Sequence, residues 1–99
     1  MGKVNLRKEA RGRPCQVRLP GCDGGGETTV LAHYRMPGLC GVGMKPDDAI
    51  GAWCCASCHD LVDYRVKGWT KQMSSIDLKH AHAEGVMRTI AALRKEGLL

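Results

Sequence analysis

The chain has 99 residues, of which 43% are apolar and 25% are charged, enough for one small domain and too few for two. Phe is absent and aromatic residues make up only 4%, so large core side chains are scarce and another source of stability is expected. No apolar run approaches the length that spans a bilayer, and no apolar stretch follows the basic N-terminus. We therefore expect a cytoplasmic protein that makes no membrane contact.

The balance of 15 basic against 10 acidic residues gives a net charge of +5. This charge suits a polyanionic partner such as nucleic acid, although a merely soluble basic protein has the same balance. Residues 1–13 have no apolar periodicity and five basic side chains, so we expect a mobile arm that contacts phosphates, ahead of one domain over residues 14–99. The basic residues of the arm are Lys3, Arg7, Lys8, Arg11 and Arg13.

The domain begins with a turn-rich loop over residues 15–27, in which two cysteines flank a Pro-Gly turn. Residues 28–34 contain adjacent β-branched side chains and predict a strand that carries His33 near its end. A long loop rich in glycine and proline follows, and residues 49–55 form a short apolar run that suits a second strand. A helix is predicted to start at Ser57 and to stop before Gly68.

A last helix is predicted from Ile76 to Lys95. Ser74 and Asp77 have the spacing of a capping box, and Gly97 stands where a helix C-cap belongs. One apolar stripe is expected to face the core: Ala83, Val86, Met87, Ile90 and Leu93. His80 and His82 are two positions apart, so they point in different directions and are expected to be ordinary surface or packing histidines.

The six cysteines suggest metal binding, because disulfides are uncommon in a reducing cytosol. Cys55, Cys58 and His59 match a haem-attachment motif literally, but haem attachment needs export and a second axial ligand. A redox pair would need a strand-helix-strand context that this short chain does not show. Neither haem nor redox chemistry is therefore favoured.

A structural zinc site fits the cysteines better, since zinc takes four thiolates from two short knuckles. Cys15 and Cys22 supply one knuckle, while Cys55 and Cys58 supply the other. Cys40 and Cys54 are left as spares, and either one remains an alternative to a chosen ligand.

His59 is not one of the four ligands assigned to this zinc site. Asp63 lies four residues later, on the same helical face, so the pair can either hold a divalent cation or form an ordinary surface hydrogen bond. The residues alone leave both readings open.

Four segments carry a resemblance to a known family: "PCQVRLPGC", "ETTVLAHYRM", "KPDDAIGAWCCASCHD" and "EGVMRTIAALRKEGLL". Along nearly the whole chain they resemble the YbcO-like nuclease family of lambdoid prophages. The order of a strand ending in histidine, a second strand and a Cys-x-x-Cys-His helix also resembles HNH, or His-Me, endonucleases. The resemblance implies an α+β fold in which a zinc-stabilised ββα-metal unit is followed by an additional C-terminal helix.

The resemblance also implies catalytic roles. His33 would be the general base, and His59 a ligand of a catalytic Mg²⁺ or other divalent ion, which Asp63 could complete. Many family members have a second metal ligand directly before the base, where this chain has Ala32. They also have an asparagine that orients the base; this chain lacks it, and Asp48 is close enough to take its place. The implied function is metal-dependent hydrolysis of DNA, with phage recombination proteins as possible partners; the alternative is a non-catalytic, zinc-dependent DNA-binding or recombination-accessory module.

Overall fold

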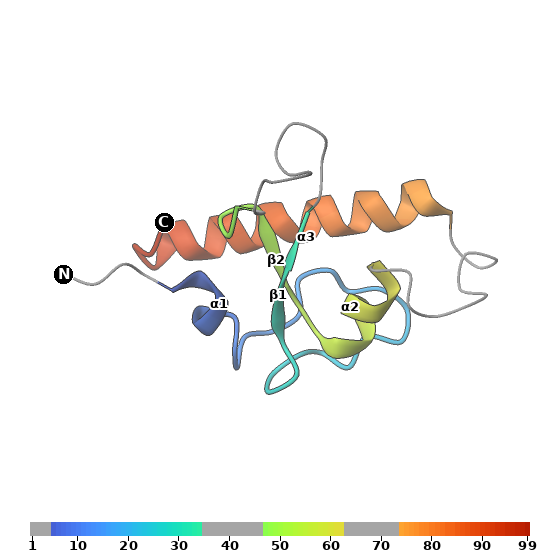
Figure 1. Ribbon diagram of the computed structural model, residues 1–99, viewed down its shortest axis with the longest axis horizontal. Coiled ribbons are helices and arrows are strands. Elements are labelled where there is room, and N and C mark those ends of the chain that lie inside the picture. Colours follow the sequence, from blue (N-terminus) through green and yellow to red (C-terminus); the bar gives the residue numbers. More distant parts are fainter. Residues whose placement is uncertain (1–4, 35–46, 63–73) are drawn as a thin grey trace.

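The computed structural model describes residues 5–34, 47–62 and 74–99. The described elements form a small α+β arrangement in which a two-stranded sheet is accompanied by three helices (Figure 1). In chain order they are α1 (Leu6–Glu9), β1 (Val30–His33), β2 (Gly51–Cys54), α2 (Ala56–Val62) and α3 (Ser75–Lys95).

The sheet pairs β1 with β2 in antiparallel register, so that His33 lies opposite Gly51 and Val30 lies opposite Cys54. Every residue of β2 is buried, and α3 crosses this strand and packs against it (Figure 1). Gly85 allows the close approach, because a Cβ at this position would lie 3.2 Å from Ala52 Cβ. Both predicted strands are confirmed, although each is shorter than its apolar segment.

The long helix α3 is confirmed with both of its predicted ends. The Ser74 hydroxyl accepts a hydrogen bond from the Asp77 N–H at 3.1 Å, which satisfies one of the unpaired donors of the first turn. At the other end Gly97 has φ +76°, and the Leu98 N–H donates to the Leu93 carbonyl. This six-to-one hydrogen bond is the Schellman closure that glycine favours.

The predicted core stripe of α3 is wrong at one position. Val86 and Leu93 are buried as expected, whereas the side chain of Met87 is 67% exposed. Successive helical residues are rotated by about 100°, so Met87 turns outward when its neighbour Val86 faces the sheet. Polar side chains fill part of the buried face instead, since His82 and Thr89 are both buried.

The start of the chain also differs from the expectation of a mobile arm through residue 13. Residues 6–9 form α1, whose N-terminus is capped by the Asn5 side chain. Leu6 and Ala10, one helical turn apart, are both buried, and they pack with Trp53 and Leu93. A single helical turn has only these two inward positions, which are too few to register as apolar periodicity.

Helix α2 starts one residue before the predicted cap, directly after Cys55. It packs against β1 and α3. Its predicted stop at Gly68, and most of the predicted loop before β2, lie outside the described residues. In the described part of the chain, none of the helices combines the length and apolar character needed to cross a membrane.

Candidate metal centre and active site

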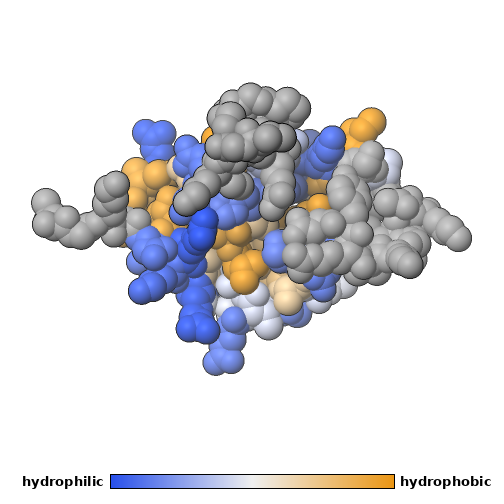
Figure 2. Space-filling view, in the orientation of Figure 1, coloured by the Kyte–Doolittle hydropathy of each residue, from blue (hydrophilic) through white to orange (hydrophobic). Residues whose placement is uncertain are grey.

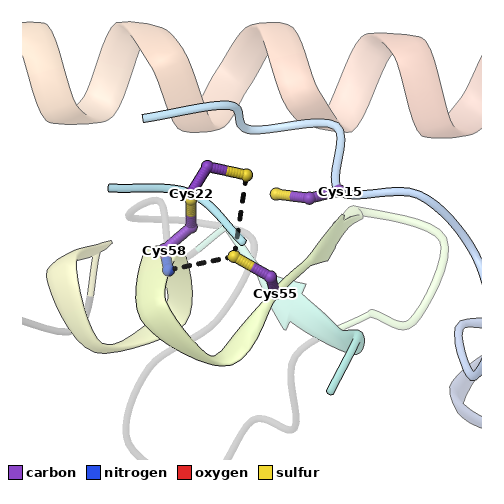
Figure 3. A group of neighbouring side chains, drawn as sticks. All are labelled: Cys15, Cys22, Cys55 and Cys58. Atoms are coloured by element: carbon purple, nitrogen blue, oxygen red, sulfur yellow. Dashed lines mark hydrogen bonds between the residues drawn. The ribbon is translucent and has the colours of Figure 1, made fainter. Parts of the chain in front are cut away.

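Four cysteine sulfurs meet beside the start of α2. The Sγ atoms of Cys15, Cys22, Cys55 and Cys58 all lie within 4.8 Å of one another, and Figure 3 shows these side chains converging from the loop before β1 and from the start of α2. Cys22 is half-buried and the other three are buried. The two predicted knuckles are therefore brought together.

Backbone N–H groups aim the sulfurs of each knuckle. In the first knuckle the Gly24 N–H donates to Cys22 Sγ at 3.3 Å. In the second, the first turn of α2 directs the Cys58 N–H to Cys55 Sγ at 3.4 Å. Such donors stabilise thiolate charge, which metal coordination requires.

The arrangement fits a tetrahedral metal ion. Zinc–sulfur bonds of about 2.3 Å imply sulfur–sulfur separations of about 3.8 Å in a tetrahedron, and the Sγ atoms of Cys22 and Cys55 are 3.7 Å apart. Four thiols without a partner disulfide, in a small protein with few aromatic residues, match a closed structural site. The four cysteines can hold a metal ion.

Gly25 is required by the first knuckle. It forms a bridge with Pro14 and has φ +89°, and a Cβ there would lie 2.5 Å from the Cys15 backbone nitrogen. A side chain cannot be accommodated without moving the segment that carries Cys15. The three consecutive glycines, predicted only as turn formers, thus include one that is needed for close approach.

Cys54 is completely buried next to the site, yet its sulfur is not in the group of four. A hydrogen bond with Cys54 is the largest influence that lowers the pKa of Cys15, and the same contact raises the pKa of Cys54. Cys54 therefore lies close enough to the site to favour ionisation of Cys15 while remaining protonated itself. Cys40, the other spare, lies outside the described residues.

His33, at the end of β1, contacts a carboxylate. Its Nε2 lies 2.6 Å from Asp48 Oδ1, and the His33 side chain is 15% exposed. Arg7 Nε donates to the same oxygen at 3.2 Å. The contact with His33, helped by Arg7, holds the pKa of Asp48 below its usual value, so this carboxyl group is charged at neutral pH.

A second histidine holds the strand in place beside His33. His82 projects from α3 into the core, and its Nε2 donates to the Ala32 carbonyl oxygen at 2.8 Å. Its ring also packs against Tyr34 with centroids 5.2 Å apart. The packing role predicted for His82 is confirmed, and the exposed His80 lies 3.8 Å from Glu84 on the surface.

His59 lies in α2, one residue after the second knuckle, and is half-buried. Its N–H donates to the Cys55 carbonyl at 2.8 Å, which fixes its place in the first helical turn. Because α2 packs against β1, His59 and His33 are on contacting elements. Asp63, the suggested companion of His59, lies outside the described residues.

The basic residues assigned to an arm have different environments. Lys8 and Arg11 are exposed, whereas Arg7 is paired with Asp48. Arg13 makes two hydrogen bonds of 2.7 Å to Glu96. Lys3 lies outside the described residues.

Arg13 has a structural role in addition to its charge. Its guanidinium carbon lies 4.8 Å from the centre of the Trp53 ring, and it also contacts Glu9. The hydrogen bonds to Glu96 raise its pKa. These contacts connect α1, β2 and the end of α3, which makes Arg13 less suited to phosphate binding than Lys8 or Arg11.

The partners of Arg7 and Arg13 were not foreseen from the sequence. Arg7 and Asp48 are 41 positions apart, and Arg13 and Glu96 are 83 apart. No local spacing encodes such pairs. The contact between His33 and Asp48 was predictable only from the family pattern. That pattern has an asparagine that orients the base, and Asp48 lies near the corresponding position of this chain.

Comparison with known proteins assigns the chain to a family. Residues 4–98 match the family profile described as "Putative nuclease YbcO". Proteins named "Putative nuclease YbcO" from Escherichia coli (strain K12) and "Putative nuclease ybcO" from Enterobacteria phage 82 are each 48% identical over 97 residues, which is 97% of this chain and 97% of each relative.

A solved structure has a similar fold. The "Structure of a putative bacteriophage protein from Escherichia coli str. K-12 substr. MG1655" is similar with a TM-score of 0.76 and 41% sequence identity. The match covers 94% of this chain and 100% of that chain. The protein described here therefore belongs to the YbcO family, whose profile and two relatives carry the name "Putative nuclease".

Proposed function

We propose that this protein is a metal-dependent endonuclease of the HNH type that hydrolyses DNA phosphodiester bonds in a phage or prophage setting. The single observation that carries the proposal is the contact between His33 Nε2 and Asp48 Oδ1, 2.6 Å long, on a strand next to a four-cysteine centre. The nuclease names of the relatives support it.

The contact with Asp48 favours the tautomer of His33 that a general base needs. Nε2 carries the hydrogen and donates it to the charged carboxylate, so Nδ1 of the neutral ring has the free lone pair. Nδ1 can then accept a proton from a water molecule as that water attacks phosphorus. Asp48 is the residue that orients the ring, in the place where the family resemblance implies an asparagine.

The order β1, β2, α2 supports the HNH assignment, since the second cysteine pair opens the helix that follows the two strands. Zn²⁺ bound by the four cysteines would be structural and would fix α2 against the first knuckle. His59, with Asp63, would hold a Mg²⁺ or similar ion. When bound, that ion would stabilise the charge that develops on the phosphate and on the departing oxygen.

DNA is the proposed substrate and the cytoplasm the proposed location. Exposed basic side chains such as Lys8 and Arg11, together with Lys3, would replace counterions on phosphates, and these contacts position a substrate without reading its sequence. Phage recombination proteins are the proposed protein partners.

A second candidate function is a non-catalytic DNA-binding or recombination-accessory role. One observation favours it: Ala32, directly before His33, is 2% exposed and provides no metal ligand. Its carbonyl oxygen is already occupied by His82. The position where many relatives would bind the catalytic ion is therefore closed in this chain.

Cleavage assays distinguish the two functions. Purified protein is incubated with plasmid and with single-stranded DNA, with and without Mg²⁺ or Mn²⁺, beside His33→Ala and His80→Ala. His80 is a matched control, because it is a histidine on the surface of α3 whose side chain is 72% exposed and whose ring nitrogen lies 3.8 Å from Glu84. Cleavage that disappears only in His33→Ala, with unchanged zinc content, supports the enzyme; DNA binding without cleavage under either metal supports the accessory role.

A further inference from the structure

A cleft of about 610 Å³ lies between α1 and β1. Its lining includes Arg7, Lys8 and Arg11 from the first helical segment, Glu27 from the loop before β1, and Val30 and Leu31 from β1 itself. On the face seen in Figure 2, hydrophilic residues gather over α1. The cleft is therefore a basic concavity bounded on one side by the strand that carries His33.

The charges of the cleft favour an anion. Three cationic side chains face one carboxylate, that of Glu27. Lys8 and Arg11 are exposed, and within the described ranges neither forms an ion pair. Arg13, by contrast, is bound to Glu9 and Glu96. Two cations in the cleft are thus available to bind phosphate oxygens.

Two apolar residues of β1, Val30 and Leu31, contribute to the lining of the cleft. Val30 is 40% exposed, although it is a β-branched residue in a strand, while its neighbour Leu31 is buried. An exposed apolar side chain between cations suits the sugar or base of a nucleotide, whose phosphates are charged and whose rings are not. A small inorganic anion would leave this apolar surface without a partner.

The cleft is connected to the proposed catalytic histidine in two ways. Leu31, which lines the cleft, is two residues before His33 in β1, so the two side chains lie on the same face of the strand, about 7 Å apart along it. Arg7 lines the cleft and donates to the Asp48 oxygen that contacts His33. A nucleic-acid strand in the cleft would therefore extend toward His33.

We propose that the α1–β1 cleft binds the part of the DNA strand adjacent to the scissile phosphate. Lys8 and Arg11 bind its phosphates, and Val30 packs against a sugar or base. This inference rests on the proposed nuclease function for the position of the scissile phosphate, but the binding itself requires no cleavage.

The test measures binding in the His33→Ala background, where cleavage is not expected. The probe is a fluorescently labelled thymidine tetranucleotide, followed by anisotropy in the zinc-loaded protein. Lys8→Gln/Arg11→Gln should weaken binding about tenfold, and the slope of log K against log salt should fall by about 1.4 units for two phosphate contacts on a single strand. Lys79→Gln/Lys95→Gln removes the same charge from exposed positions of α3 and should change affinity less than about twofold, which is near the scale of remote, screened charges.

Val30→Thr separates the apolar contact from the charges. This near-isosteric change should weaken tetranucleotide binding about threefold without altering the salt slope, since it removes no phosphate contact. Equal losses in the two double variants would overturn the cleft assignment and leave only general attraction by net charge.

The outcome is distinguishable from that for the proposed activity. If the protein binds DNA through Lys8 and Arg11 but never cleaves it, the cleft is supported as a DNA-binding site and the nuclease function is refuted. When the two double variants are made in the protein that retains His33, equal cleavage by both would support the nuclease function and refute the cleft as the binding site.

Discussion

Arg7 and His33 meet at one atom, because both contact Oδ1 of Asp48, at 3.2 Å and 2.6 Å respectively. Arg7 comes from α1 and His33 from β1, so the carboxylate joins the first helical turn of the chain to the strand of the proposed active site. The carboxylate fixes which ring nitrogen of His33 carries hydrogen, as outer partners of catalytic and metal-bound histidines commonly do.

Substitution of Asp48 should therefore reduce DNA cleavage without removing His33. Asp48→Asn keeps a hydrogen-bond acceptor but loses the charge, and single-turnover cleavage should fall roughly 10- to 100-fold, the range typical of such outer partners. Asp48→Ala should be slower still, because no group then orients the ring.

The control for this series is zinc content and circular dichroism, both of which should stay unchanged. Asp47→Ala is the matched variant, because it removes a neighbouring carboxylate whose one hydrogen bond among the described residues is from the Ala49 N–H. A fully active Asp48→Ala would contradict the orienting role.

Cysteine substitutions should separate ligands from the bystander. Cys55→Ser should abolish stoichiometric zinc binding, because a closed site loses one of four thiolates. Cys54→Ala should retain one zinc ion per chain, since Cys54 lies outside the group of four. Metal content after gel filtration measures the difference; zinc loss in Cys54→Ala that equals the loss in Cys55→Ser would refute the assignment.

Metal removal should unfold much of the domain. The four-cysteine centre joins the loop of Cys15 to the start of α2, and with only 4% aromatic residues the chain has few bulky side chains for its core. Structural zinc sites contribute their binding free energy to folding. A chelator should therefore lower the midpoint of thermal unfolding, and Zn²⁺ but not Mg²⁺ should restore it; an unchanged midpoint in the metal-free protein would count against a structural role.

Two adjacent glycines offer a matched test of steric fit. Gly24 and Gly25 have nearly equal φ values of +86° and +89°, but only Gly25 has atoms within 4 Å of the position of a Cβ. Alanine at either position costs about 1 kcal/mol of backbone strain. Gly25→Ala should cost about 2 kcal/mol more, as measured by urea unfolding of the zinc-bound protein, whereas similar losses for the two variants would show that the loop yields to the new methyl group.

Arg13 should matter for stability more than for DNA binding. Arg13→Gln removes the hydrogen bonds to Glu96 and the contact with the Trp53 ring, and should lower the free energy of unfolding by roughly 1–3 kcal/mol. Arg11→Gln, in an exposed position, should change it by less than about 0.5 kcal/mol. The two unfolding curves, measured by urea titration, should therefore separate; coincident curves would remove the structural role.

The parts of the fold that sequence could predict are those encoded locally. The caps at Ser74 and Gly97 depend on neighbouring backbone groups, and the cysteine knuckles on short spacings, so both were predicted correctly. Met87 was misassigned because an apolar side chain does not specify which side of a helix faces the sheet. The position of His82 depends on the Ala32 carbonyl, which is 50 positions away and has no local signature.

The site was predictable to a similar extent. The grouping of the four cysteines was predicted from their spacing, and the catalytic role of His33, which the family resemblance implies, stays a prediction. The arginine contacts depend on how the chain ends are packed. An isolated helical turn is marginal in water, so a four-residue helix such as α1 forms only where tertiary contacts stabilise it. Its basic residues consequently looked like a disordered arm, although Leu6 and Ala10 anchor the segment.

The attachment of α1 has a practical consequence for anyone who shortens or tags the protein. Glu96 holds Arg13, and Leu98 packs with the cluster that contains Leu6 and Trp53. Glu96 and Leu98 are therefore part of the support for α1, which carries Arg7, and through Asp48 for His33. We therefore expect a deletion at the C-terminus to disturb the geometry of His33, which is more than sixty positions away in the sequence.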